Sequence, residues 1–345
     1  MSSRSSRSNR KNAAEFTLIR EYFSGHPSYH SDTVLGIGDD AALLQLPSDH
    51  QLVVSIDTMV EGVHFFPDVD PAALGHKLLA VNLSDLAAMG AEPRWATLAL
   101  TLPESNPEWL KPFSEGLFAL AQQHKVDLVG GDTTRGPLTL TLQVHGIVPR
   151  GKAITRAGAE LGEQICVTET LGAAGYALQQ LQQGEEAIAI RHHLERPTPR
   201  IEVGLLLREH ATAMIDLSDG LLADLGHITE RSGVGAELDL EAIPVHPALS
   251  HLTTDQQLNL ALTAGDDYEL CFTLPAELVE GVRQQLRAMN CKMSVVGEVQ
   301  SGGGVMEWSV ETSGEWFSTL LIVSCLYSKT SWTGSTMDAV DEEVE

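Results

Sequence analysis

Aspartate residues recur in this chain inside apolar or glycine-rich stretches, where a carboxylate is costly unless it is paired or binds a metal. They are Asp39 and Asp40 in GIGDDAALL, Asp57 in VVSID, Asp85 in AVNLSDLAAMG, Asp132 in DLVGGDTTRG, Asp216 and Asp219 in IDLSDG, and Asp266 and Asp267 in AGDDYEL. One such residue is often a helix cap or a turn residue, but the set as a whole would need several coincidences. Bases that could pair with them are few, 22 Lys and Arg against 47 Asp and Glu. Several divalent cations would satisfy the set, and ligands made of oxygen alone favour Mg²⁺ over zinc.

One of these carboxylates lies in a predicted helix. A helix is expected to begin at Asp70-Pro71, because a capping residue followed by proline is typical of a helix start, and to end at Gly90. Apolar residues recur on one face of this helix from Leu74 onward, and Asp85 continues that face. A carboxylate on the apolar side of a helix indicates a partner such as a cation.

Five apolar or alternating runs predict β-strands. They span residues 51–57, 95–102, 138–148, 164–168 and 212–216. Further helices are expected after Gly172 and from Asp219. Two of the strands end at an aspartate, Asp57 and Asp216, and open α/β sheets bind their ligands at strand ends. The pattern therefore predicts an α/β (α+β) protein with carboxylates at positions where such proteins bind ligands.

A length of 345 residues suggests about two domains. We expect a disordered basic tail over residues 1–14, an N-terminal domain over 15–150, a C-terminal domain over 151–330 and an acidic tail over 331–345. An apolar segment at 317–327 is expected to form a buried strand.

The formal net charge of −25 excludes general nucleic-acid binding, because so acidic a protein repels phosphate backbones. No apolar run approaches the roughly 20 residues of a membrane helix, and the first residues lack the apolar core of a signal peptide. We therefore expect a soluble, cytoplasmic protein without nucleic-acid or membrane partners. A phosphorylated ligand would need cations to approach it.

Two glycine-rich stretches imitate nucleotide-binding loops. Residues 36–41 fit the dinucleotide fingerprint G-x-G-x-x-A, but two carboxylates in that loop would repel a pyrophosphate unless a metal lay between them. Residues 146–153 match a phosphate-binding loop except at the end, where Ala153 lacks the hydroxyl that would hold Mg²⁺. Both matches are interpreted as accidental.

Six motifs in collinear order resemble the thiamine-monophosphate kinase family, part of the superfamily of aminoimidazole ribonucleotide synthetase and selenophosphate synthetase. They are GIGDDAAL, SIDTMVEGVHF, KLLAVNLSDLAAMGAEP, LVGGDTTRGPL, MIDLSDGLLADLGH and AGDDYELCF. The resemblance covers about residues 15–299, and its motifs are long enough to be specific. It implies a two-domain, synthetase-like architecture in which each domain is α/β and the N-terminal domains pair across a homodimer.

The resemblance also implies a reaction and a set of site residues. ATP would phosphorylate thiamine monophosphate to thiamine diphosphate by direct in-line transfer, the final step of thiamine diphosphate biosynthesis, with several Mg²⁺ ions and no general base. Carried over to this chain, the metal ligands would be Asp40, Ser55, Ile56, Asp57, Asp85, Asp132, Asp216 and Asp219. The residues in contact with ATP would be Gly131, Asp132, Arg156 and Ser218, and those in contact with the substrate His64 and Asp266.

Three positions depart from the family pattern. Ile56 stands where the family often has Thr and could offer only a backbone oxygen, and Asp266 stands where the family often has Glu. The closing aromatic motif of the family has only a faint counterpart at Trp332-Thr333-Gly334.

Two other functions stay open on the sequence. One is another ATP-using member of the superfamily, such as phosphoribosylformylglycinamidine cyclo-ligase, and the other is a non-catalytic protein that binds divalent cations. Selenophosphate synthetase is disfavoured, because it relies on an early cysteine and the first cysteine here is Cys166.

Overall fold

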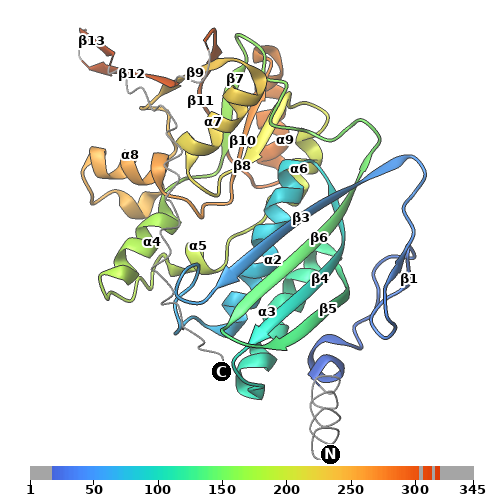
Figure 1. Ribbon diagram of the computed structural model, residues 1–345. Coiled ribbons are helices and arrows are strands. Elements are labelled where there is room, and N and C mark those ends of the chain that lie inside the picture. Colours follow the sequence, from blue (N-terminus) through green and yellow to red (C-terminus); the bar gives the residue numbers. More distant parts are fainter. Residues whose placement is uncertain (1–17, 303–305, 313–314, 319–345) are drawn as a thin grey trace, which may run out of the picture.

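The computed structural model describes residues 18–302, 306–312 and 315–318, which form two units that each combine a sheet with helices (Figure 1). The predicted tails at 1–14 and 331–345 and the motif at 332–334 lie outside the described residues, as does most of the predicted strand at 317–327. Every helix in the described part of the chain is too short or too polar to cross a membrane.

The first unit is a four-stranded sheet with two long helices on one side of it (Figure 1). In spatial order its strands are β3 (His50–Val60), β6 (Thr139–Pro149), β4 (Glu92–Leu102) and β5 (Asp127–Arg135). The helices are α2 (Pro71–Ala88) and α3 (Pro107–His124). A short π-helix η1 (Ile19–Phe23) and the strands β1 (Thr33–Leu35) and β2 (Leu43–Leu44) precede the sheet. Strands β4 and β5 are parallel and the other neighbours are antiparallel.

The two faces of this sheet have different surroundings, because successive side chains of a strand point to opposite faces. On the helix-facing side, Leu140 and Leu142 of β6 are fully buried. On the other side, which we call the open face, Leu52, Val54 and Ile56 of β3 are 47%, 47% and 58% exposed. Three large apolar side chains in a row therefore face away from the core of the chain.

Helix α2 begins as the sequence predicts. The Asp70 carboxylate accepts a hydrogen bond from the Ala72 backbone N–H (3.0 Å), and Pro71 is the first helical residue. The sheet, α3 and the second unit all contact α2, so it is buried on nearly every side, including the polar residues Lys77 and Asn82.

The second unit is built on a seven-stranded sheet, counted over the described residues, with the order β13-β12-β9-β11-β7-β10-β8. Its strands are β7 (Gln164–Thr168), β8 (Ala213–Asp216), β9 (Gly235–Asp239), β10 (Leu270–Leu274), β11 (Met293–Gln300), β12 (Met306–Thr312) and β13 (Glu315–Ser318). Its helices are α4 (Ala173–Gln182), α5 (Arg191–Glu195), α6 (Ile201–Leu207), α7 (Leu221–Ser232), α8 (Thr254–Thr263) and α9 (Val279–Ala288), with short 3₁₀ turns η2 (Pro247–Leu249) and η3 (Ala276–Leu278). All pairs are antiparallel except β9 and β12.

The five strands and three helices expected from the sequence are present, with ends shifted by a few residues. One expectation is wrong. Asp57 does not end its strand, because β3 continues to Val60. Its strand also pairs antiparallel with β6, so the strand-end rule for parallel sheets does not explain its position. Asp216 does end β8.

The two units meet along α2. Helix α6 packs against it so closely that a Cβ on Gly204 would lie 2.1 Å from the Ala87 carbonyl oxygen. Beyond the end of α2, the Arg208 guanidinium donates to the Gly90 carbonyl oxygen (2.9 Å). Because the carboxylates predicted to form the site come from both units, this contact sets their separation.

Replacing Gly204 with alanine should therefore lower stability. The added methyl group cannot fit against the Ala87 carbonyl, so the helices must separate, at a cost of about 1–3 kcal/mol. Thermal and urea unfolding of Gly204→Ala measure this loss. The matched control is Gly281→Ala in α9, where a Cβ meets nothing within 4 Å and should add about 0.5–1 kcal/mol of stability. Equal effects of the two substitutions would contradict the close contact.

Candidate functional site

Four of the predicted metal ligands, one of them a serine, lie close together where α2, β3 and β8 meet. Asp85 on α2 accepts a hydrogen bond from the Ser55 hydroxyl on β3 (2.5 Å). Asp57, two residues after Ser55, lies on the same, helix-facing side of β3. Burial, reinforced by the charge of Asp85, raises the pKa of Asp57 to about 6.

Asp216 brings a carboxylate of the second unit to this group. It is buried at the end of β8, and burial together with the charges of Asp85 and Asp224 raises its pKa to about 7. Burial also raises the pKa of Asp85, although the Ser55 hydroxyl and the positive charge of Arg156 oppose this. Asp57, Asp85 and Asp216, which we call the carboxylate cluster, therefore repel one another, and Arg156 is the cation that acts on Asp85.

The loop after β8 is held by a buried carboxylate that sequence analysis missed. Asp224, in the first turn of α7, accepts a hydrogen bond from the Asp219 backbone N–H (3.0 Å). Burial raises the pKa of Asp224 to about 7. The loop also contacts the AGDDYE segment, where the Asp266 N–H donates to the Ser218 carbonyl (3.0 Å). Ser218 and Asp219, predicted to contact ATP and metal, are thus positioned by backbone contacts.

A pocket of about 390 Å³, which we call the interdomain pocket, adjoins the cluster at Asp57. This volume is in the range of small-molecule sites. Both predicted substrate residues, His64 and Asp266, line it. The His64 ring accepts a hydrogen bond from the Val60 N–H at Nδ1 (3.0 Å), so its neutral form carries the proton on Nε2 and can donate to a ligand.

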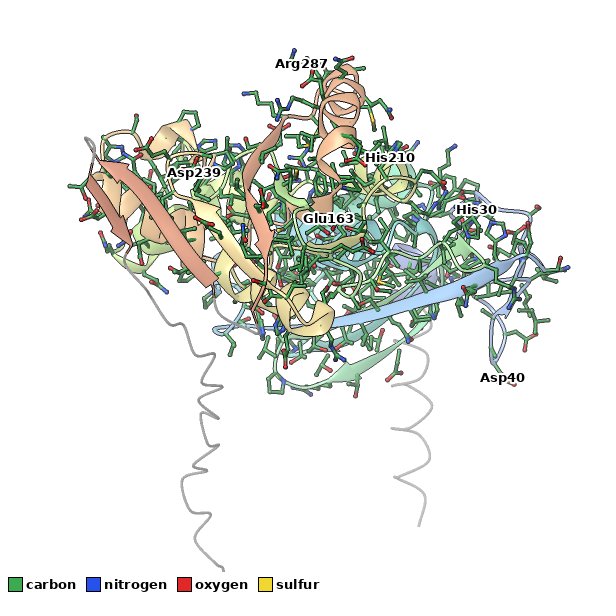
Figure 2. The ribbon with its side chains drawn as sticks, turned by 90° about the horizontal axis from the view of Figure 1, so that it is seen from above. His30, Asp40, Glu163, His210, Asp239 and Arg287 are labelled. Atoms are coloured by element: carbon green, nitrogen blue, oxygen red, sulfur yellow. The ribbon has the colours of Figure 1, made fainter. Side chains whose placement is uncertain are left out.

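Three other predicted site residues form a second group at the far edge of the first sheet. Asp40, Gly131 and Asp132 line another pocket of about 750 Å³. Asp40 is exposed on the loop between β1 and β2, at the rim of the molecule (Figure 2). A Cβ on Gly131 would lie 1.9 Å from the Leu98 carbonyl oxygen, so only glycine fits this strand position.

Asp132 and Asp57 are on opposite faces of the sheet. Asp132 pairs with Ala99, which lies between the helix-facing residues Leu98 and Leu100 of β4. Asp132 therefore lies on the open face, as Ile56 does, whereas Asp57 faces α2. Strands β3 and β5 are also three strand spacings apart, about 14 Å. One chain therefore does not bring the two groups together.

The absence of a preformed metal cage agrees with this separation. Within the described residues, no three His, Cys, Asp or Glu side chains are close enough to hold one metal ion. A cation could be held by two carboxylates of the cluster, with ligands from a phosphorylated substrate or a second subunit completing its coordination.

Sequence analysis missed other residues at this site. Lys77 lines the interdomain pocket and forms an ion pair with Asp266 (2.9 Å). The sequence did contain a signal for Lys77, since this charged residue directly precedes the apolar run at 78–81 of the helix. Tyr268 donates its hydroxyl to Asp266 (3.1 Å), and Asp267 accepts from the Gly172 N–H at the start of α4 (2.9 Å). These two roles depend on the fold and had no signal in the sequence.

Two family models match this arrangement of domains. The model of AIR synthase related protein, N-terminal domain, matches residues 38–148, and that of AIR synthase related protein, C-terminal domain, matches residues 160–308. The chain therefore belongs to the family of AIR synthase related proteins.

Similarity to individual relatives assigns the chain to a narrower group within this family. The chain is 55% identical over 269 residues to the thiamine-monophosphate kinase of Salmonella typhimurium, covering 76% of this chain and 82% of that protein. The crystal structure of thiamine-monophosphate kinase from Stenotrophomonas maltophilia K279a superposes with a TM-score of 0.78 at 47% identity, covering 81% and 92% of the two chains. AaThiL complexed with AMPPCP and TMP superposes with a TM-score of 0.69 at 30% identity, covering 82% and 91%. Within the family, the chain belongs to the thiamine-monophosphate kinases, which confirms the resemblance of its motifs.

The half-buried Asp267 generates a prediction about pH. Burial raises its pKa to about 8, opposed by the Gly172 N–H, whereas the unfolded chain has a pKa near the ordinary value of about 3.9. The folded protein thus keeps a proton that the unfolded chain releases, so this group stabilises the fold less and less as the pH rises from about 4 to about 8. Asp267→Asn should remove that dependence and gain a few kcal/mol over the wild type between pH 5 and pH 8.5. Urea unfolding at both pH values measures it.

The control for this measurement is Asp255→Asn, which removes an exposed carboxylate from α8. Its stability curve should run parallel to that of the wild type. A parallel curve for Asp267→Asn as well would contradict the assignment.

Proposed function

We propose that this protein transfers a phosphoryl group from ATP to thiamine monophosphate, giving ADP and thiamine diphosphate, as the final step of thiamine diphosphate biosynthesis in the cytoplasm. The observation that carries the proposal is the carboxylate cluster beside a pocket of substrate size at the junction of the two units. Relatives named thiamine-monophosphate kinase and a related structure with AMPPCP and TMP support it.

The cluster fits Mg²⁺ by the chemistry of its donors. It offers carboxylate oxygens alone, the ligands this cation prefers. Burial and mutual repulsion raise the pKa values of Asp57 and Asp216, and a bound cation would relieve both effects. Asp57, Asp85 and Asp216 would hold Mg²⁺, which would supply electrostatic stabilisation of the charge that develops in the transition state.

The side chains around the pocket would then position the acceptor. The second pKa of a phosphate monoester is about 6, so the acceptor oxygen is largely deprotonated at neutral pH and needs no general base. His64 would donate from Nε2 to the substrate without taking up a proton. Arg156 lies near Asp85 and Asp224, where it could contact the phosphates of ATP, and Ser218 lies in the adjacent loop.

We infer that two chains pair through the open faces of their four-stranded sheets. The exposed row Leu52, Val54 and Ile56 gives this face an apolar patch, which is typical of an interface. Asp132 lies on the same face. Because the carboxylate cluster lies behind β3, an edge strand of this sheet, we place β5 of the partner subunit along that edge, where the partner subunit's Asp132 and the partner subunit's Asp40 can reach around it to the cluster. Each site would then be built from two chains.

The direct test is ADP release by the full-length protein with Mg²⁺ and ATP. We expect release that depends on thiamine monophosphate, together with formation of thiamine diphosphate. Asp85→Asn should lose most of this turnover, because it removes a charge from the centre of the cluster. ADP release that is independent of thiamine monophosphate would favour another ATP-using activity of the superfamily, and none at all would favour a non-catalytic cation-binding protein.

If each site is built from two chains, two inactive variants should restore activity when their subunits are mixed. Asp85→Asn and Asp132→Asn should each be nearly inactive. After subunits of the two variants have been exchanged at equal concentration, half of the dimers are mixed, and each mixed dimer has one intact site, so about a quarter of the wild-type activity should return. If both residues served the site of their own chain, mixing would restore nothing.

A further inference from the structure

Lys77 is a buried cation at the junction of the two units. It lies on α2 and is only 5% exposed. Its ammonium group reaches across to the second unit and lies 2.9 Å from the Asp266 carboxylate. In the described part of the chain, Asp266 is the only acidic residue within ion-pair distance of it. A lysine is rarely buried unless it is paired or used, so its position needs an explanation.

The partner of Lys77 is held firmly. Asp266 has a left-handed backbone conformation (φ +66°), which is uncommon for a residue other than glycine. Its N–H donates to the Ser218 carbonyl (3.0 Å). The same carboxylate oxygen, Oδ1, faces both Lys77 and the Tyr268 hydroxyl. Asp266 therefore fixes the position of the Lys77 ammonium at the wall of the interdomain pocket.

The charges that line this pocket make Lys77 distinctive. Asp57, Glu195 and Asp266 contribute three acidic side chains, and among the described residues that line the pocket Lys77 is the one lysine or arginine. A phosphate group that enters such a pocket is repelled unless a cation meets it. An ammonium group has three N–H donors, and in the described part of the chain the ammonium group of Lys77 forms one ion pair, with Asp266 Oδ1, so donors are left for a ligand.

We propose that Lys77 binds the phosphate of thiamine monophosphate and thereby selects the phosphorylated acceptor over unphosphorylated thiamine. The inference rests on the proposed function and extends it to specificity. Asp266 acts as the residue that positions Lys77, and His64 donates to the same phosphate from the neighbouring wall of the pocket. Charge-assisted hydrogen bonds from a desolvated ammonium are strong enough to discriminate between the two ligands.

The test is calorimetric titration of the full-length protein with thiamine monophosphate and, separately, with thiamine, at constant Mg²⁺ and without ATP. The wild type should prefer thiamine monophosphate. Lys77→Met should weaken binding of thiamine monophosphate by about tenfold to a hundredfold and change binding of thiamine by less than about threefold. Lys77→Arg, which keeps the charge, should retain most of the preference.

A second variant, Asp266→Asn, removes the ion pair that positions Lys77 and leaves the cation. It should keep part of the preference for the phosphorylated ligand, less than the wild type and more than Lys77→Met. If Lys77 were only a structural link between the units, Lys77→Met and Asp266→Asn would weaken both ligands alike. That result would overturn the proposal, as would an unchanged preference in Lys77→Met. If Lys77→Met failed to fold, Lys77→Gln would take its place, because glutamine is polar but carries no charge. A full preference for thiamine monophosphate in Lys77→Gln would equally overturn the proposal.

The outcomes also separate this inference from the proposed function. A wild-type protein that binds neither ligand would contradict the function itself. A wild type that binds thiamine monophosphate and thiamine with equal affinity, or a Lys77→Met variant that keeps the full preference, would contradict only the role of Lys77.

Discussion

The concentration of buried and half-buried carboxylates at the junction of the two units is the constraint on which the rest of the structure depends. Asp57, Asp85 and Asp216 come from β3, α2 and β8, and each is raised in pKa by burial. Burying such groups near one another is unfavourable without cations. The fold tolerates this repulsion because α2 is enclosed by its own sheet, by α3 and by the second unit. Burial of these apolar surfaces contributes more stability than the repulsion removes. The carboxylate cluster therefore lowers the stability of the metal-free protein, and cations bound at the cluster would restore that stability.

The sheet of the first unit divides the site residues between its two faces. Side chains that face α2 join the cluster, and side chains on the open face, including Asp132, lie beside an exposed apolar row. This division explains why a chain with so many conspicuous aspartates holds no complete metal cage in its described part. If two chains pair through this face as we propose, assembly of the subunits is coupled to assembly of the site, and an isolated chain would bind cations and nucleotide poorly.

The sequence was sufficient to predict the main helices and strands and to single out Asp57, Asp85 and Asp216, which the fold brings together, because both leave local patterns. The cap at Asp70 and the apolar face that continues to Asp85 are examples. It could not show that Asp132 faces away from Asp57, because the face of a residue depends on strand register, which is set by pairing far along the chain. The sequence also could not show that the adjacent residues Asp266 and Asp267 have different roles. Left-handed conformations at Asp266 and Tyr268 send adjacent carboxylates to different partners, Lys77 in one case and the start of α4 in the other.

The most direct test of this account is whether Mg²⁺ displaces protons from the cluster. Calorimetric titration of the full-length protein with Mg²⁺ at pH 6.5, in two buffers of different ionisation enthalpy, measures the protons released on binding. With pKa values of about 6 for Asp57 and about 7 for Asp216, protonated carboxylates are present at that pH and must lose their protons to bind a cation. The account predicts net proton release at pH 6.5 that disappears at pH 8.5. Binding heats that are independent of the buffer at pH 6.5, or no binding at all, would contradict it.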